Sequence, residues 1–300
     1  MTSALILAAG FGTRLHPLTL ELPKPVVPVG DRPLLAHVAE ACHLAGAERL
    51  VANAHHEHQK LCAIINELKL GVEVVVEPEL RGTAGGVAGA RRLLGEGPVL
   101  VWNGDILAEP PAARLLAEAR DPRAQVLAVS PRRLGEGSVG LDEEGRVVRL
   151  RGRIFGREIR SGDYIGVMAL GANVVAALPP RGCLIGDVAL RALERGQRVS
   201  AVESAGAWSD LGDLAAYVEA NFRWLDQAGR TVWLAPGSRV GPEVRLERSL
   251  IGDRVEVGGS GLVREVIAWP GARFSAPLSF AVVLGSGRVV PFDAAAAAEN

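Results

Sequence analysis

The sequence predicts an α/β protein with a doubly wound, mostly parallel β-sheet and a small C-terminal β-domain. Short apolar runs alternate with helical segments over residues 1–228, the pattern of strand–helix–strand units in a parallel sheet. The first run ends at a pair of glycines, which predicts a turn at the end of a strand. Beyond Gly229, apolar residues recur every six positions, which is typical of a left-handed parallel β-helix. We therefore divide the chain into residues 1–228 and 229–300.

Composition and charge exclude several classes of protein. Apolar residues make up 48% of the 300 positions and charged residues 22%, which is enough for a sizeable core. The net charge of −1 gives no electrostatic footprint for nucleic acid or an anionic membrane. The three cysteines are scattered and odd in number, which argues against a disulfide framework. No apolar stretch is long enough to span a bilayer. The N-terminus has no basic residue before its apolar run, as a signal peptide would. We expect a reduced, cytoplasmic protein.

The first predicted strand, Ala4–Ala9, leads into a glycine turn that is suited to phosphate. Gly10 and Gly12 lack a Cβ, so backbone N–H groups there can approach a ligand closely. Arg14 adds a planar, permanently charged donor fork that suits phosphate oxygens. Lys24 lies between two prolines, which hold its backbone extended. The stretch therefore predicts a polyphosphate site, with a plain glycine turn and a surface Arg14 as the alternative.

Two better-known phosphate motifs are excluded by the same residues. A dinucleotide fingerprint needs a third glycine where the chain has Leu15, and a P-loop needs a glycine before a lysine, which none of the three lysines has.

The whole opening string resembles the signature of the sugar-1-phosphate nucleotidyltransferases. That signature is an apolar strand, Ala-Gly-x-Gly-Thr-Arg-Leu, Pro-Leu-Thr and Pro-Lys-Pro, and it is matched at residues 9–15, 17–19 and 23–25. The resemblance is nearest to mannose-1-phosphate guanylyltransferases and muramate-phosphate uridylyltransferases. It implies a Rossmann-like fold and the reaction of an NTP with a sugar 1-phosphate to give an NDP-sugar and pyrophosphate, with GTP slightly favoured over UTP. It assigns catalytic roles to Arg14 and Lys24, and nucleotide contacts to Ala9, Gly10, Gly12 and Thr13.

The next elements alternate between helices and strands. A helix is expected to about Ala45, a strand over Arg49–Asn53, a helix from His55 to about Leu70 and a strand over Val72–Glu77. The histidine-rich segment 55–58 could suggest a metal, but adjacent helix-start residues point in different directions. We interpret these histidines as polar helix-start residues.

A glycine-rich segment then precedes a helix that runs to about Leu94. Backbone without side chains at such a position suits the approach of a flat or anionic group. The resemblance implies that Gly82, Thr83 and Gly85 lie against the nucleotide base and ribose. The alternative is an ordinary helix start with Thr83 as the N-cap.

The strand Pro98–Trp102 ends in Asn103-Gly104-Asp105. A carboxylate at the C-terminal end of a parallel strand faces the crevice where such sheets bind ligands. Substrates that carry phosphates need Mg²⁺, which takes hard oxygen ligands and usually one or two carboxylates. Asp105 is the first candidate for a Mg²⁺ ligand, and Asn103 is a sugar-binding candidate. The alternative is a turn in which Asp105 bonds its own loop.

The central part of the chain departs from the resembling enzymes. A helix is expected over Ala112–Ala119, a strand over Ala124–Ser130 and a hairpin over Ser138–Leu150 with a turn at 143–145. Many relatives have Glu-Lys-Pro after this hairpin, with the lysine on the sugar phosphate. This chain has no lysine there, and three arginines are open candidates: Arg149, Arg151 and Arg153. Gly166, in the strand Asp163–Met168, resembles the family's glycine beside the sugar pocket.

A second carboxylate follows a helix over Ile185–Arg195 and a strand over Arg198–Glu203. Asp210 matches the second Mg²⁺ ligand of the resembling enzymes in their Trp-x-Asp-x-Gly motif. Both Asp210 and Asp213 could instead be helix-start residues, where negative charge is favourable.

The C-terminal part is predicted to be all β. The six-residue repeat is carried by Leu234, Val240, Leu246, Ile251, Val257, Val263 and Trp269. Closing strands are expected over Phe274–Pro291, and the Ala294–Ala298 run is expected to fray. In resembling enzymes such a part serves oligomer contacts or regulation, so a homo-oligomer is a further expectation.

Two other functions stay open from sequence. A non-catalytic subunit that binds a sugar nucleotide would explain the missing lysine, although intact Arg14, Lys24 and both aspartates argue against it. A CTP-dependent phosphocholine cytidylyltransferase would share the opening motif.

Overall fold

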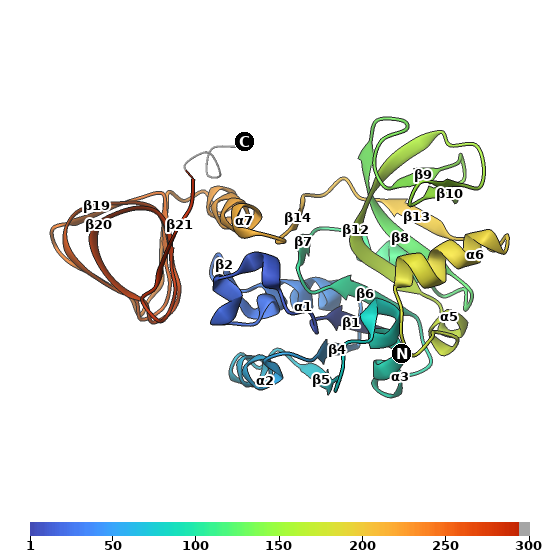
Figure 1. The fold of residues 1–300 in the computed structure, drawn as a ribbon, viewed down its shortest axis with the longest axis horizontal. Helices are drawn as coiled ribbons and strands as arrows, with labels where there is room; N and C mark the ends of the chain where they lie inside the picture. The colour runs from blue at the N-terminus through green and yellow to red at the C-terminus, as the bar shows by residue number, and fades with distance from the viewer. Residues whose placement is uncertain (294–300) are drawn as a thin grey trace. The chain divides into compact units, whose positions relative to one another are not determined.

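The structure is a computed structural model that describes residues 1–293 (Figure 1). The Ala294–Ala298 run, predicted to fray, lies outside the described residues. By its internal contacts the chain forms two compact units. The first comprises Met1–Gly10 and Leu35–Trp208, and the second comprises Phe11–Leu34 and Ser209–Asn300.

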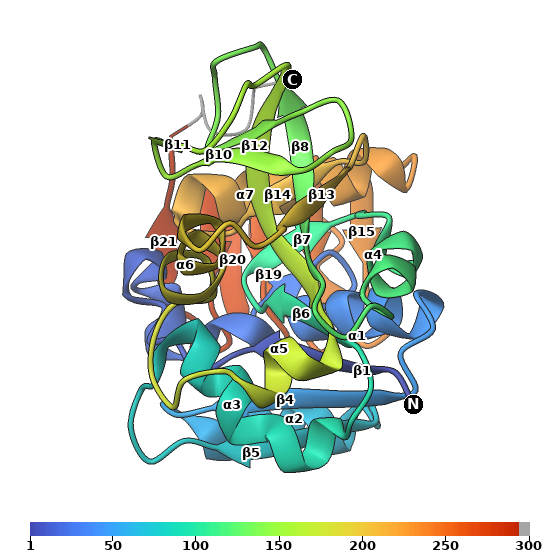
Figure 2. The same ribbon diagram turned by 90° about the vertical axis from the view of Figure 1, so that its right-hand side faces the viewer.

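The first unit is built on a ten-stranded sheet whose central strands are parallel (Figures 1 and 2). Strand β1 (Ser3–Leu7) pairs in parallel with β4 (Arg49–Ala54) on one side and β6 (Val99–Asn103) on the other, and β4 pairs in parallel with β5 (Val72–Val76). Beyond β6 the sheet turns antiparallel at β12 (Arg160–Leu170). The predicted α/β class with a large, mostly parallel central sheet is confirmed.

The remaining strands of this sheet extend it beyond β12. They are β8 (Gln125–Arg132), β9 (Val139–Leu141), β10 (Val147–Leu150), β11 (Arg153–Ile154) and β13 (Ser200–Glu203). Strands β9 and β10 form the predicted antiparallel hairpin, and β13 pairs in parallel with β8.

Six α-helices of the first unit connect these strands, all except α5 close to a predicted position. They are α1 (Leu34–Leu44), α2 (His58–Glu67), α3 (Gly82–Leu94), α4 (Ala112–Glu118), α5 (Ala172–Ala176) and α6 (Leu190–Glu194). The helix predicted over Ile185–Arg195 is present as a continuous helical segment, but its first part, η4 (Leu184–Ala189), is π-helical and only its second part, α6, is α-helical. The helix predicted from His55 begins only at His58, because His55 is tied by Nδ1 to the carbonyl oxygen of Glu77 at 2.8 Å.

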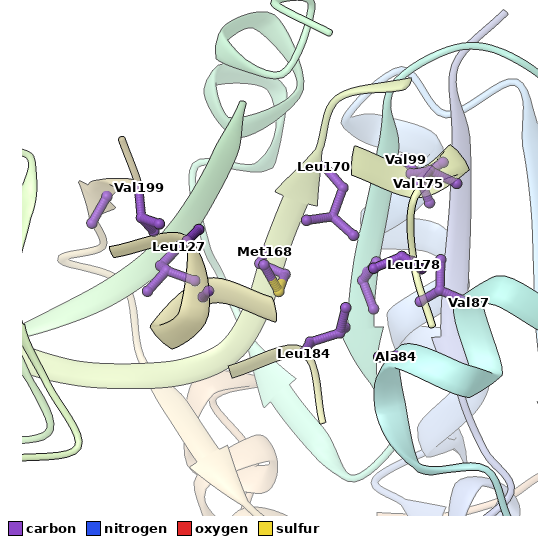
Figure 3. Packing of buried hydrophobic residues seen from close by; sticks show 14 of the residues in the cluster. Ala84, Val87, Val99, Leu127, Met168, Leu170, Val175, Leu178, Leu184 and Val199 are labelled. Atoms are coloured by element: carbon purple, nitrogen blue, oxygen red, sulfur yellow. The ribbon is translucent and has the colours of Figure 1, made fainter. Parts of the chain in front are cut away.

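The core of the first unit lies between the sheet and helical segments (Figure 3). Val87 on α3, Val99 on β6 and Met168 on β12 are fully buried within it. Burying a side chain of this size contributes about 1.5–3 kcal/mol, so this cluster holds the sheet ends and helix starts in fixed positions.

In the second unit, α7 (Leu214–Gln227) contacts two distant segments of the chain. The Tyr217 hydroxyl donates to the carbonyl oxygen of Pro28 at 2.7 Å and accepts from Trp269 Nε1 at 2.8 Å. The backbone N–H of Gly30 donates to Asn221 Oδ1 at 2.9 Å. Helix α7 therefore fixes the segment 11–34 on the same body as the C-terminal strands.

The segment 11–34 consists of short turns and a two-stranded ribbon. They are η1 (Thr13–Leu15), η2 (Leu18–Leu20), η3 (Lys24–Val26), β2 (Pro28–Val29) and β3 (Arg32–Pro33).

The C-terminal strands pair mostly in parallel. They are β15 (Val232–Leu234), β16 (Arg239–Val240), β17 (Val244–Glu247), β18 (Ser249–Ile251), β19 (Glu256–Ala268), β20 (Arg273–Val283) and β21 (Val289–Pro291). Parallel partners lie 17 residues apart in pairs such as Val232–Ser249 and Val257–Phe274. Of the predicted apolar repeat positions, Val263 and Trp269 are fully buried, whereas Leu234 is 47% exposed.

Candidate functional site

The end of β1 is fixed by a chain of buried polar side chains. The N–H of Ala8 donates to Asn53 Oδ1 at 2.8 Å, and Asn53 Nδ2 donates to Glu77 Oε1 at 2.7 Å. Ala9 is buried and Gly10 is exposed at the end of this run. Asn53 and Glu77 are not among the site residues predicted from the sequence, although each is a polar residue at the end of a predicted apolar strand, a position that could have identified it.

Asp105 is placed next to the end of β1 by the glycine that precedes it. The N–H of Gly104 donates to the carbonyl oxygen of Leu7 at 2.9 Å, and a Cβ on Gly104 would lie 2.6 Å from that oxygen. A larger residue would therefore push this turn away from β1. Asp105 is half-buried, between β6 and β7 (Ile106–Ala108).

Asn103 and Gly166 lie side by side in the same unit. Gly166 has a φ of +77°, and a Cβ there would lie 3.0 Å from Asn103 Nδ2 and 2.7 Å from Ile106 Cγ1. The glycine therefore makes room for the Asn103 amide, so the structure brings together the two predicted sugar-binding residues.

The start of α3 packs closely against residues 180–184, a contact that was not predicted from the sequence. A Cβ on Gly82 would lie 2.5 Å from the carbonyl oxygen of Gly182, and one on Gly85 would lie 2.6 Å from that of Pro180. Thr83 Oγ1 accepts from the N–H of Leu184 at 2.8 Å. The alternative of Thr83 as N-cap is wrong, because α3 begins at Gly82 with Arg81 in the cap position.

A cavity of about 270 Å³ in the first unit joins several of these residues. Its lining includes Thr83, Asn103, Ser138, Arg151, Tyr164 and Cys183. Two residues predicted separately, Thr83 and Asn103, therefore face one cavity, and Arg151 lines it while its Nη2 donates to Cys183 Sγ at 3.5 Å.

The other two candidate arginines are bound to carboxylates. Arg149 pairs with Glu158 through Nε at 2.7 Å and Nη2 at 2.8 Å, and Arg153 pairs with Glu194. The Arg149 guanidinium holds the pKa of Glu158 below its usual value, and Glu158 in turn raises the pKa of Arg149. Arg149 is thus a structural residue of this hairpin.

In the second unit, Gly12 brings the glycine turn against Lys24. Gly12 adopts a φ of +65°, and a Cβ there would lie 3.1 Å from Lys24 Cβ and 3.0 Å from Thr19 Cγ2. The Thr19 hydroxyl donates to the carbonyl oxygen of Gly12 at 2.8 Å, which closes the loop. Lys24 is buried at the start of η3, while Thr13 is exposed in η1.

Arg14 and Asp210 meet at Gly212 in the same unit. A Cβ on Gly212 would lie 2.8 Å from Arg14 Nη1 and 3.3 Å from Asp210 Oδ1. The glycine of the Trp-x-Asp-x-Gly motif therefore leaves space for a guanidinium beside a carboxylate. Asp210 ends β14 (Trp208–Asp210), whereas Asp213 is the N-cap of α7 and its Oδ1 accepts from the N–H of Ala216 at 3.0 Å.

The donor chemistry of the two aspartates fits Mg²⁺. Carboxylate oxygens are hard ligands, and Mg²⁺ uses one or two of them together with substrate phosphates and water. Within residues 1–293, no group of three or more His, Cys, Asp or Glu side chains lies together in a way that could hold a metal ion. In the same range, no helix is both long enough and apolar enough to cross a membrane.

Comparisons with known proteins identify the family. A family model described as nucleotidyl transferase matches residues 3–227. Probable mannose-1-phosphate guanylyltransferase 2 of Arabidopsis thaliana is 29% identical over 88% of this chain and 76% of its own length. Probable mannose-1-phosphate guanylyltransferase 1 of Oryza sativa subsp. japonica is 30% identical over 85% of this chain and 74% of its own length.

Comparison with solved structures supports the α/β fold described above. The crystal structure of HddC from Yersinia pseudotuberculosis matches with a TM-score of 0.62 at 20% identity, covering 75% of this chain and 100% of that chain. Because the family model spans most of the sequence and the rice relative shares 30% identity over most of its length, this chain belongs to the nucleotidyl transferase family.

Proposed function

We propose that this nucleotidyltransferase transfers GMP from GTP to mannose 1-phosphate, giving GDP-mannose and pyrophosphate. The observation that best supports the proposal is that similar proteins are named as mannose-1-phosphate guanylyltransferases. Those from Arabidopsis thaliana and Oryza sativa are named as mannose-1-phosphate guanylyltransferases, and the chain covers about three-quarters of their length, 76% and 74%. This relationship favours GTP over UTP and a sugar phosphate over phosphocholine.

The second unit supplies the charges for the nucleotide phosphates. Gly12 in this unit, like Gly10 in the first unit, allows phosphate oxygens to approach the backbone, and Arg14 holds the departing phosphates. Lys24, braced by Pro23 and Pro25, neutralises charge that gathers at the α-phosphoryl group. The attacking sugar phosphate oxygen is already ionised, so no general base is required. Catalysis then consists of positioning and charge neutralisation.

Asp105 and Asp210 are the residues we assign to Mg²⁺. The ion, when bound, would supply further neutralisation of phosphate charge. The assignment is supported by carboxylate chemistry and by the resemblance of both motifs to the metal ligands of the family. Arg14 beside Asp210 limits the net charge at this point of the second unit.

The sugar phosphate is assigned to the 270 Å³ cavity of the first unit. Asn103 and Ser138 offer donors and acceptors for sugar hydroxyls, and Gly166 keeps the Asn103 amide accessible. Arg151 takes the phosphate in place of the lysine of other enzymes, because Arg149 and Arg153 are engaged by Glu158 and Glu194.

For the C-terminal strands we infer a left-handed parallel β-helix. Parallel partners 17 residues apart, as in Arg239–Glu256, are close to three six-residue repeats per coil. The stacked strands end in the antiparallel pair β20–β21, which covers the last parallel edge.

The test is pyrophosphate release over a matrix of four NTPs with several sugar 1-phosphates and phosphocholine, together with calorimetric titration of the protein with GDP-mannose. We expect GTP with mannose 1-phosphate to give the highest kcat/KM, by about tenfold over other pairs, which corresponds to about 1.4 kcal/mol. Turnover only with CTP and phosphocholine would identify a cytidylyltransferase instead. Tight binding of a sugar nucleotide without any pyrophosphate release would identify a regulatory subunit.

A further inference from the structure

A loop at residues 133–138 contributes to the wall of the 270 Å³ cavity, which we call the sugar cavity. Ser138, the last residue of the loop, lines this cavity, and the whole loop is exposed. Gly135 and Gly137 in the loop adopt positive φ values of +87° and +71°. An exposed segment with two glycines has many backbone conformations open to it, so fixing it costs conformational entropy. Ser138 therefore has a defined place at the cavity only if other residues bind the loop.

Two side chains of β12 bind backbone N–H groups of this loop. The N–H of Gly135 donates to Ser161 Oγ at 2.7 Å, and the N–H of Ser138 donates to Asp163 Oδ1 at 3.1 Å. Asp163 is itself held by Arg132, whose Nε donates to Oδ2 at 2.7 Å. The central sheet therefore fixes the loop at two points, one of which is the residue that lines the cavity.

Arg149 binds the two residues between these points. Its Nη1 donates to the carbonyl oxygen of Gly137 at 2.8 Å, and its Nη2 donates to that of Glu136 at 2.9 Å. Glu158 holds the same guanidinium through Nε at 2.7 Å and Nη2 at 2.8 Å, and Ser161 Oγ donates to this carboxylate. The side chains of Arg149 and Glu158 are only 13% and 17% exposed, so water competes little with these bonds. The last four residues of the loop are thus all bound, two of them by Arg149.

Gly140 makes room for the ion pair between Arg149 and Glu158. It lies opposite Arg149 in the ladder between β9 and β10. A Cβ on Gly140 would lie 2.5 Å from Glu158 Cδ and 2.8 Å from Arg149 Cβ. Any larger residue at this position would therefore displace the pair that holds the loop.

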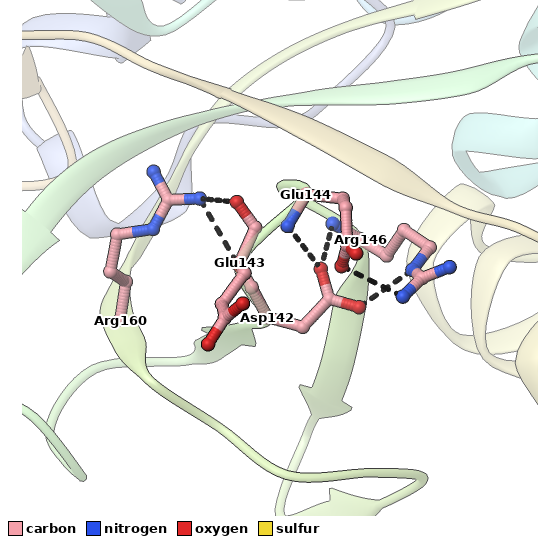
Figure 4. A network of polar contacts seen from close by, with 5 residues as sticks. All are labelled: Asp142, Glu143, Glu144, Arg146 and Arg160. Carbon is pink, nitrogen blue, oxygen red and sulfur yellow. Dashed lines mark hydrogen bonds and ion pairs between the residues drawn. The ribbon is translucent and has the colours of Figure 1, made fainter.

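The turn of the hairpin β9–β10 has a separate network of polar contacts (Figure 4). Asp142 accepts from the N–H and Nε of Arg146 at 2.8 Å and 2.6 Å. Arg160 Nη2 donates to the carbonyl oxygens of Asp142 and Glu143 at 3.0 Å and 3.2 Å. Because these contacts close the turn, the two bonds from Arg149 to carbonyl oxygens serve the other end of the hairpin, where the loop 133–138 enters it.

The Ser138 hydroxyl has a proton to offer to a ligand. Its Oγ accepts from the N–H of Tyr164 at 3.0 Å, and within residues 1–293 the hydroxyl donates to no other group. A serine hydroxyl carries one donor and two acceptor positions, so Ser138 can donate to an oxygen of the sugar. A site that hydrogen-bonds a substrate hydroxyl discriminates against an analogue that lacks it.

We propose that Arg149 is a positioning residue, which holds the loop 133–138 so that the Ser138 hydroxyl donates to one hydroxyl oxygen of the sugar, and that this contact sets the selectivity among sugar 1-phosphates. The inference rests on the reaction proposed above, because it assigns part of the sugar substrate to Ser138. Arg149 acts on the sugar through the loop, and its guanidinium makes no contact with the phosphate.

Kinetics with deoxy analogues test this contact. The substrates are mannose 1-phosphate and its 2-, 3-, 4- and 6-deoxy analogues, each with GTP. In the wild type, removal of the hydroxyl that Ser138 binds should lower kcat/KM by about tenfold or more, mainly through KM for the sugar. In Ser138→Ala this analogue and mannose 1-phosphate should agree within about twofold, and the same analogue should lose its penalty in Arg149→Ala.

The penalty is a ratio of two substrates measured on one variant, so it does not depend on the fraction of folded protein. Arg157→Ala is the matched control, because Arg157 is an exposed arginine next to Glu158 and does not line the cavity. It should keep every penalty of the wild type. Ser138→Ala with all penalties intact would overturn the proposal. So would an Arg149→Ala variant that is slower with all substrates equally.

These outcomes differ from a failure of the proposed reaction. A wild type that releases no pyrophosphate with any sugar 1-phosphate would reject the reaction itself, and the role of Ser138 with it. An active wild type whose penalties survive in Ser138→Ala or Arg149→Ala would reject only the inference drawn here.

The order of the loop can be measured without any turnover. Hydrogen–deuterium exchange, followed by mass spectrometry of a peptide that covers residues 133–138, reports the N–H groups of Gly135 and Ser138. Their exchange should be about tenfold or more faster in Arg149→Ala, and unchanged in Arg157→Ala, because loss of the two carbonyl bonds lets the loop open locally. Exchange as slow in Arg149→Ala as in the wild type would overturn the positioning role even if the enzyme makes GDP-mannose.

Discussion

At the scale of single residues, Asp105, Asp210 and Asp213 have the same side chain in different settings. Asp213 caps a helix, and Asn caps equally well, so Asp213→Asn should leave both stability and activity nearly unchanged. Asp105→Asn and Asp210→Asn should each lower kcat by about a hundredfold and raise the Mg²⁺ concentration needed for half-maximal rate. The measurement is pyrophosphate release across a Mg²⁺ titration. Full activity of Asp105→Asn at low Mg²⁺ would remove the metal assignment.

Arg151 and Arg153 form a second matched pair. Arg151→Ala should raise KM for the sugar 1-phosphate by about tenfold or more with little change in KM for GTP, because a charge-assisted phosphate contact is lost. Arg153→Ala removes a side chain that is 60% exposed and pairs with Glu194, so the kinetics of this variant should match wild type. Steady-state kinetics with each substrate varied in turn checks both variants. Equal effects of the two changes would contradict the assignment of Arg151.

Sequence reasoning at this scale succeeded where a residue's role is local. Asp213 as a helix-start residue follows from its position in the chain alone. Asn53, whose partners are Ala8 and Glu77, could not be placed that way, because its hydrogen bonds join three separate strand ends. The alternative of Thr83 as an N-cap failed for the same reason, since the partner of Thr83 is Leu184, 101 residues further on.

At the scale of elements, the hairpin β9–β10 is tied to the following loop by Arg149 and Glu158. Because the pKa of Glu158 is lowered in the folded state, its stabilising effect is present above the ordinary value of 4.5 and is lost as pH falls through the folded pKa. Glu158→Gln should therefore lower the free energy of unfolding by about 1–3 kcal/mol at neutral pH, with a smaller difference at about pH 3.

Urea denaturation at both pH values measures this difference. Glu144→Gln is the control, because Glu144 is 60% exposed and its ion pair with Arg146 should contribute less than about 1 kcal/mol. A Glu158→Gln deficit that stays constant from pH 7 to pH 3 would show that the charge of Glu158 is not its source.

Element positions were predicted well where apolar periodicity is strong, as in β1, β6 and α3. The predicted helix at 185–195 was only partly right, because tertiary contacts override its local pattern. Cys183 Sγ accepts from the N–H of Gly186, and a Cβ on Gly186 would lie 2.9 Å from Arg151 Nη1. Neither contact can be read from the spacing of apolar residues.

At the scale of the molecule, Tyr217 links segments that are far apart in the sequence. Its hydroxyl bonds Pro28 and Trp269, so Tyr217→Phe leaves a carbonyl and an indole N–H without this partner in a buried place. We expect a loss of about 1–3 kcal/mol in unfolding free energy, measured by thermal or urea denaturation. A neutral Tyr217→Phe would show that these bonds do not hold residues 11–34 on α7.

The overall class and the parallel pairing of the C-terminal strands were predictable, since both follow from periodicity. The grouping of residues 11–34 with α7 was not, because bonds such as Gly30–Asn221 join residues nearly two hundred positions apart. Long-range hydrogen bonds of this kind leave no regular signal in a single sequence.

The central claim is that GMP passes from the nucleotide to a sugar phosphate. GTP labelled at the α-phosphorus, incubated with mannose 1-phosphate, Mg²⁺ and the full chain, tests it most directly. The account predicts that the label appears in GDP-mannose in step with unlabelled pyrophosphate. Label that stays in GTP, or that appears as GMP without any sugar attached, would contradict it.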